Sequence, residues 1–146
     1  MWDYPRPPAC LPSSRHVVVR AGDRIVADTR RAFRILETSH PPTWYLPRAD
    51  VDESVIEASR TSSTWCEWKG AATYWDVAGH RAAAWSYEQP SPGYEQITGF
   101  LAFSPREFEC YIDGERVRPQ EGGFYAGWIT SDVVGPFKGG PGTVGW

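Results

Sequence analysis

Short apolar runs alternate with polar and turn-forming residues along this chain, and their spacing predicts strands instead of helices. Residues 17–19 and 25–27 are apolar and lie on either side of Ala21-Gly22-Asp23, which predicts a hairpin with a Gly-Asp turn. A second hairpin is predicted from residues 71–77 and 81–87, on either side of Ala78-Gly79-His80.

Shorter runs predict the remaining strands. In the run from Ala32, Phe33 and Ile35 alternate with Arg34 and Leu36, so both faces are partly apolar and the strand is expected to lie between layers. The strands expected outside the two hairpins are residues 32–38, 43–46, 55–58, 98–103 and 107–112. A helical turn is expected after Asp50, and Asp113-Gly114 is expected to form a tight turn.

The two ends of the chain differ in composition from the middle. Residues 1–15 contain four prolines, which predicts an extended arm without regular structure. Residues 119–146 hold eight of the fourteen glycines, interleaved with large aromatic residues that flexible linkers lack. We therefore predict an all-β fold with one small domain, residues 16–118, and a glycine- and aromatic-rich tail that packs on the domain or on a partner.

Composition and charge narrow the class of protein. Aromatic residues make up 14% of the chain, which favours strands over helical bundles. The formal net charge is −3, so no basic face for nucleic acid or an anionic membrane is expected. Cys10, Cys66 and Cys110 are widely separated, which argues against a disulfide framework and a zinc site. We find no signal peptide or apolar spanning segment, and we expect a soluble cytoplasmic protein with no metal and no cofactor.

The richest stretch of aromatic residues runs from residue 64 to 87 and contains four of the eight tryptophans. Trp85 and Tyr87 point to the same side of a strand, and a two-residue turn would place Tyr74 and Asp76 on that side too. Three aromatic rings and one carboxylate would then converge, as in many small-molecule sites. The alternative is that these rings belong to the sheet core.

Several polar residues near these aromatic residues are candidates for chemistry. Lys69 could hold an anionic group or act as an amine with a lowered pKa, and it could activate the thiol of Cys66. Glu37 could accept a hydrogen bond or act as a general base, and Arg48 could clamp an anion. The alternatives are a solvated lysine, a buried inert cysteine and a surface ion pair.

An ordered series of motifs resembles the domain-of-unknown-function family numbered 427, over about residues 16–113. The matching motifs are Glu37-Thr38, Pro41-Pro42-Thr43-Trp44-Tyr45-Leu46-Pro47, Thr64-x-Cys66-x-x-Lys69-Gly70-x-Ala72-x-Tyr74, Ala84-Trp85-x-Tyr87 and Ala102-Phe103. Three positions depart from the family pattern, at Glu67, Trp68 and Ser104, so the rim of the site is expected to differ from that of other members.

The resemblance implies a β-tent, in which two antiparallel sheets meet at one edge and splay apart around a pocket. Tent-like relatives carry zinc on paired Cys-x-x-Cys motifs that this chain lacks, so the metal is not transferred. The family also carries a nucleotidyltransferase-type label, but we find no paired-aspartate metal site with a Gly-Ser phosphate loop.

These observations lead to one expected function and two alternatives. We expect the domain to bind an unidentified small molecule in an aromatic pocket, with no nucleic acid and no membrane as partner. The expected site residues are Glu37, Tyr45, Arg48, Cys66, Lys69, Tyr74, Trp85 and Tyr87. The first alternative is an enzyme that uses Cys66 or Lys69 for nucleotidyl transfer or sulfur and redox chemistry. The second is an interaction module that forms a homodimer, or binds another protein, through its aromatic tail.

Overall fold

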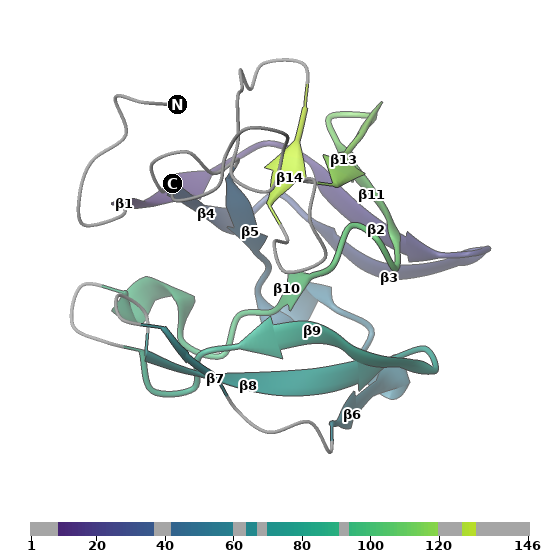
Figure 1. Ribbon diagram of the computed structural model, residues 1–146. Coiled ribbons are helices and arrows are strands. Elements are labelled where there is room, and N and C mark those ends of the chain that lie inside the picture. Colours follow the sequence, from purple (N-terminus) through teal and green to yellow (C-terminus); the bar gives the residue numbers. More distant parts are fainter. Residues whose placement is uncertain are drawn as a thin grey trace, which may run out of the picture.

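The computed structural model describes residues 9–36, 42–59, 64–66, 70–90, 94–119 and 127–130, with the backbone alone at residues 9, 64–66, 70 and 71. In these residues the regular structure consists of strands and three 3-10 turns, so the all-β prediction is confirmed (Figure 1). The turns are η1 (Arg48–Asp50), η2 (Glu53–Val55) and η3 (Glu95–Ile97).

The strands form three antiparallel sheets and one two-stranded ladder. The first sheet has the order β1 (Ala9–Ser13), β4 (Ala32–Leu36), β5 (Thr43–Tyr45). The second has the order β10 (Ala102–Phe103), β9 (His80–Ser86), β8 (Gly70–Val77), β6 (Ile56–Ala58), and β7 (Thr64–Cys66) also pairs with β8. The third has the order β12 (Glu115–Arg116), β11 (Glu109–Ile112), β2 (Val17–Ala21), β3 (Arg24–Thr29), and β13 (Arg118–Pro119) pairs with β14 (Trp128–Ile129).

The first and second sheets meet along one edge, which we call the ridge. Next to β5 and β10, Leu46 and Leu101 exchange two backbone hydrogen bonds of 2.8 Å. From this edge β4 and β1 extend on one side, and β9 and β8 on the other (Figure 1). Two antiparallel sheets that share an edge and splay apart form a β-tent.

The ridge strands are buried on both faces. Their side chains alternate between the two faces, and each face packs against a different cluster. Trp44 and Leu46 face a main core that also contains Val19 from β2 and Val77 from β8. Tyr45 and Ala102 face a second cluster on the other side of the ridge. We call this second group the aromatic cluster: its buried members are Ile35, Tyr45, Ala72, Tyr87, Tyr94, Ile97 and Ala102, and Cys10, Phe33, Tyr74, Trp85 and Phe100 pack against it.

Both predicted hairpins are confirmed. The first joins β2 to β3 through Gly22-Asp23, where Gly22 has a φ of +62°. The second joins β8 to β9 through Ala78 and Gly79, which both have positive φ, at 49° and 86°. Two positive φ angles in a two-residue loop match the twist of the flanking strands, and this explains why the short turn closes the hairpin.

Two predictions about strands are wrong. Residues 9–13, which we expected in an arm without regular structure, form β1. Pro12 is tolerated there because β1 lies at the edge of its sheet, where one side of the strand needs no amide donor. The strand predicted for residues 98–103 is limited to residues 102–103, since Gly99 has a φ of +72° and follows η3.

A hydrogen-bonded carboxylate ties the turn at η2 to the first hairpin. Asp52 accepts bonds of 2.6 Å from Ser54 Oγ, 2.7 Å from Arg24 Nη2 and 3.1 Å from the Ser54 amide. These bonds, from the Ser54 hydroxyl first and then Arg24, lower the pKa of Asp52 from 3.8 to about 2. The ionised carboxylate therefore stabilises the fold at neutral pH.

Acid is expected to remove this stabilisation. Because the pKa of folded Asp52 lies below its ordinary value, its contribution is complete above about pH 4 and is lost as the pH falls towards 2. Urea unfolding across this range should show a weaker pH dependence for Asp52→Asn than for the wild type, while Asp23→Asn, in the exposed turn, should behave like the wild type. Equal pH dependence in the wild type and Asp52→Asn would contradict the assignment.

Candidate functional site

Four of the residues predicted to line a pocket lie together in the aromatic cluster. Tyr74 on β8 lies directly opposite Trp85 on β9, and Tyr45 reaches them from β5 in the other sheet. The Tyr45 and Tyr87 rings are 6.2 Å apart between centroids and tilted by 50°. Trp85 Nε1 donates a long hydrogen bond of 3.4 Å to Tyr45 Oη.

These four aromatic residues differ in exposure. Tyr45 and Tyr87 are buried, with 1% and 5% of their surface exposed. Tyr74 and Trp85 are half-buried and pack against them. The buried pair therefore supports the cluster from within, while Tyr74 and Trp85 present ring surface that another molecule can contact.

The segment from Tyr94 to Phe100 contributes three residues that sequence reasoning missed. Tyr94 and Ile97 are buried in the aromatic cluster, and Phe100 packs against Phe33 with ring centroids 5.8 Å apart in an edge-to-face arrangement. Gly99 ties this segment to the cluster through a 3.1 Å bond from its amide to the carbonyl of Tyr87. The sequence signal for the Phe33–Phe100 contact was the alternation that places Phe33 on an apolar face of its strand.

Asp76 follows the alternation of β8, in which Trp75 and Val77 face the main core, but its carboxylate is bonded at the hairpin end. The β8–β9 register shifts between Trp75 and Val77, and Ala82 takes a φ of 50° in the resulting bulge. The amide of Ala82 donates a 2.8 Å bond to Asp76 Oδ1, and this bond is the main reason that the pKa of Asp76 is lowered. The Asp76 carboxylate therefore serves as the hydrogen-bond acceptor for a backbone amide in the bulge.

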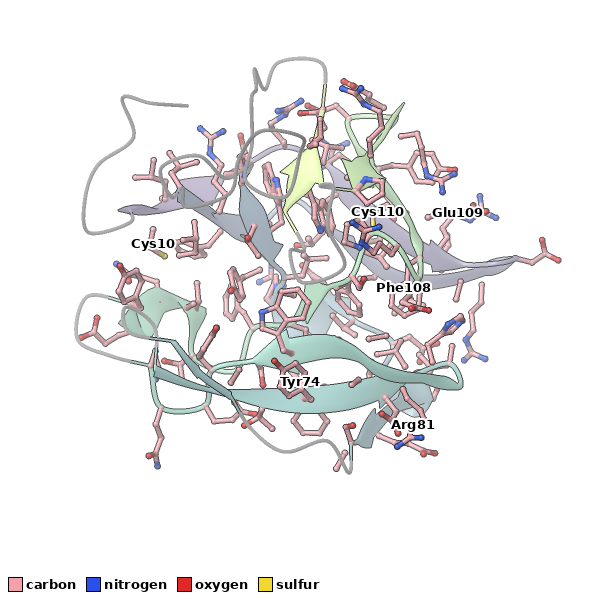
Figure 2. All side chains as sticks on the ribbon, in the orientation of Figure 1. Cys10, Tyr74, Arg81, Phe108, Glu109 and Cys110 are labelled. Atoms are coloured by element: carbon pink, nitrogen blue, oxygen red, sulfur yellow. The ribbon has the colours of Figure 1, made fainter. Side chains whose placement is uncertain are left out.

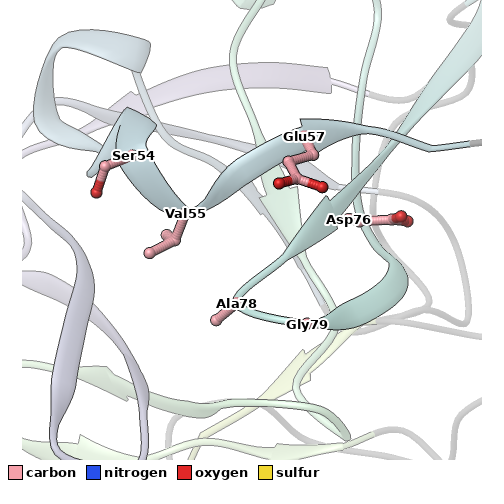
Figure 3. Close-up of a pocket in the computed structure, with 6 residues that line it drawn as sticks. All are labelled: Ser54, Val55, Glu57, Asp76, Ala78 and Gly79. Carbon is pink, nitrogen blue, oxygen red and sulfur yellow. The ribbon is translucent and has the colours of Figure 1, made fainter.

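Asp76 instead lines a separate surface pocket of about 310 Å³ at the end of the hairpin (Figure 3). Glu57 lies opposite Asp76 in the β6–β8 ladder and shares the pocket. The other lining residues are Ser54, Val55, Ala78 and Gly79. Within the described residues, no three His, Cys, Asp or Glu side chains are grouped so that they could hold a metal ion.

Arg48 lies on the face of β8 opposite to Tyr74. Its guanidinium is 4.5 Å from the centroid of the Trp75 ring. Arg48 Nε is 3.2 Å from Glu53 Oε1, and Nη1 is 3.7 Å from Glu88 Oε1. With an aromatic face and two carboxylates around it, the cation is already compensated, and it fastens η1 to the second sheet.

The remaining predicted polar residues fall largely outside the described part of the chain. Glu37 and Lys69 are not among the described residues, and for Cys66 only the backbone is described, in β7 opposite Gly70. Their roles stay predictions.

The two described cysteine side chains occupy different environments (Figure 2). Cys10 on β1 packs against the aromatic cluster, and its partial burial raises the pKa of its thiol. Cys110 is fully buried in the main core, which raises its pKa to about 12. Both thiols are therefore protonated at neutral pH and act as apolar groups.

The aromatic cluster offers apolar and stacking contacts. Polar groups come from the tyrosine hydroxyls and the Trp85 indole. This arrangement can hold a flat molecule by its ring faces.

None of the helical turns in the described part of the chain has the length and apolar character to span a bilayer.

Comparisons with known proteins place the domain in a family. No curated protein matches the chain significantly. A family model described as a domain of unknown function, DUF427, matches residues 9–114, a range that includes both tent sheets and the aromatic cluster. The chain therefore belongs to the DUF427 family.

Proposed function

We propose that this domain binds a small, flat molecule against the aromatic cluster between the first and second sheets. One observation carries the proposal: Tyr45 comes from the first sheet and is distant in sequence from Tyr74, Trp85 and Tyr87, yet the four residues meet in one cluster. Small-molecule sites are commonly lined by aromatic side chains with a few polar groups among them.

The four aromatic residues differ in exposure, and we therefore expect them to have different roles in binding. The half-buried rings of Tyr74 and Trp85 would contact the ligand, while the buried rings of Tyr45 and Tyr87 would fix their positions. Stacking a ring on an aromatic side chain contributes about 1–3 kcal/mol. Two such contacts are enough for a ligand of modest affinity.

The same residues limit the chemistry of the ligand. The part of the ligand that touches the cluster should be planar, because the rings of Tyr74 and Trp85 offer flat apolar surface. A hydroxyl or ring nitrogen of the ligand could bond to a tyrosine hydroxyl. Ring faces also attract cations, so a planar cation fits the same surface.

Native mass spectrometry of freshly purified protein is the direct test. We expect a molecule bound in a 1:1 ratio, which denaturation releases for identification. If the protein is purified without ligand, a panel of planar heterocycles can be screened by tryptophan fluorescence. The absence of a bound molecule and of any saturable fluorescence change would contradict the proposal.

A pair of tyrosine variants localises the binding. Tyr74→Ala should weaken binding of the identified molecule by about 5- to 150-fold, which corresponds to the loss of one stacking contact of about 1–3 kcal/mol. Tyr111→Ala is the matched control, because Tyr111 is also a half-buried strand tyrosine but belongs to β11 in the third sheet. Isothermal titration should give a changed dissociation constant for Tyr74→Ala alone. Equal loss in both variants would place the ligand elsewhere.

A further inference from the structure

A short C-terminal segment is inserted into the ridge, on the opposite side from the aromatic cluster. The Trp128 side chain is 1% exposed and stacks on Trp44, with ring centroids 6.4 Å apart and an angle of 29° between the rings. Its Nε1 donates a 3.1 Å bond to the carbonyl of Phe103 on β10, and its amide donates a 2.9 Å bond to the carbonyl of Pro42, just before β5. Trp128 thus bonds to β10 and to the residue that precedes β5.

We call the groups around Trp128 the ridge seat: Pro42, Trp44, Phe103 and the paired strand β13. The first three lie within residues 9–114, the range that matches the family, whereas β14 lies beyond it. The seat is therefore built largely by residues that match the family, while the tryptophan that occupies it lies outside the matched range.

The contacts in the seat do not depend on which copy of the chain supplies the tryptophan. β14 is held by one antiparallel pairing, of Arg118 with Ile129 and Pro119 with Trp128, and by the ring and the two hydrogen bonds. A strand from another molecule can make the same contacts, as in domain exchange. We propose that the ridge seat also accepts residues 127–130 of a second copy, so that two copies exchange these segments and form a dimer.

The connection between β13 and β14 decides which form dominates. Residues 120–126 join the strands, and seven residues span at most about 24 Å when extended. For a connection as short as this, the effective concentration for docking within one chain is in the millimolar range. The monomer should therefore dominate at micromolar protein, and exchange should become favourable when docking within the chain is prevented.

Removal of residues 120–126 tests the exchange. In this variant only Gly127 would separate Pro119 from Trp128, and one residue is too short to let an antiparallel pair of strands fold back. All residues of the seat and Trp128 itself are retained. Size-exclusion chromatography with light scattering at about 10 µM, far below the millimolar effective concentration, should give a dimer, whereas the wild type should be a monomer.

The matched control carries the same deletion together with Trp128→Ala, and it should be monomeric. A monomer for the deletion variant would overturn the proposal, and so would a dimer that persists in the control, because it would use another surface. If the deletion variant does not fold, wild-type protein refolded at about 1 mM and then diluted should contain a trapped dimer. A monomer after that treatment would also overturn the proposal. None of these outcomes depends on ligand binding at the aromatic cluster.

Discussion

Replacing Trp128 by alanine is expected to lower the free energy of unfolding by about 3–5 kcal/mol. The side chain is almost completely buried, and its removal leaves a cavity against Trp44 as well as an unpaired carbonyl at Phe103. A cavity of this size costs more than the lost burial alone, because the surrounding ridge strands are fixed by their own hydrogen bonds. Urea denaturation with an unchanged slope would measure the loss directly.

Two further variants separate the ring from its hydrogen bond. Trp128→Phe keeps most of the ring but removes the donor to the Phe103 carbonyl, so an unsatisfied buried acceptor should cost about 1–3 kcal/mol. Ile129→Ala is the neighbouring control, since Ile129 is half-buried and should cost less than Trp128→Ala. If Trp128→Ala and Ile129→Ala lost equal stability, the ridge seat would not be the main anchor of the C-terminal segment.

Replacing Tyr45 by alanine is expected to have the second largest effect, also about 3–5 kcal/mol. Tyr45 is 1% exposed on a ridge strand. Its ring lies beside that of Tyr87, and its hydroxyl accepts the hydrogen bond from Trp85 Nε1. Tyr74→Ala should cost less, because a half-buried side chain loses less apolar burial and leaves a smaller cavity. Urea unfolding of the two variants gives the comparison.

The difference between these two tyrosines also bears on the proposed function. Tyr74→Ala should keep the fold and lose ligand affinity, whereas Tyr45→Ala should lose stability first. Tyr45→Phe keeps the ring and removes only the hydroxyl, so it should retain most of the stability. A Tyr74→Ala variant that is as unstable as Tyr45→Ala would make Tyr74 a structural residue and would weaken its assignment as a ligand contact.

Local signals were sufficient to predict the hairpins and the all-β class. The turns at Gly22 and at Ala78-Gly79 follow directly from turn chemistry and from the alternating runs around them. It was also predictable that Tyr74 and Trp85 share a face of the hairpin, since a two-residue turn fixes which side each residue faces, but their direct pairing depends on the register shift in β9. The position of Tyr45 beside them came from the resemblance, because contacts between sheets leave no periodic signal in one sequence.

The failures have specific physical causes. Asp76 was misplaced because its carboxylate accepts a hydrogen bond from the Ala82 amide in a bulge of β9, and no local residue signals a bulge at an alanine with positive φ. β1 was missed because Pro12 suggested an arm, although an edge strand tolerates proline. An aromatic tail that packs on the domain or on a partner was predicted, but the place where Trp128 is buried was not predictable, since its seat is assembled from strands far away in the sequence.

The burial of both faces of the ridge strands limits how the length of the chain can vary. Along β5, Trp44 faces the main core and Tyr45 faces the aromatic cluster, so one inserted residue would send each side chain to the opposite compartment. A strand with one solvent face could absorb such an insertion by exposing part of its surface, but the ridge has no solvent face to use. Insertions and deletions should therefore be tolerated at the β2–β3 hairpin turn, beside exposed Ile25, and be excluded from residues 43–46 and 101–103.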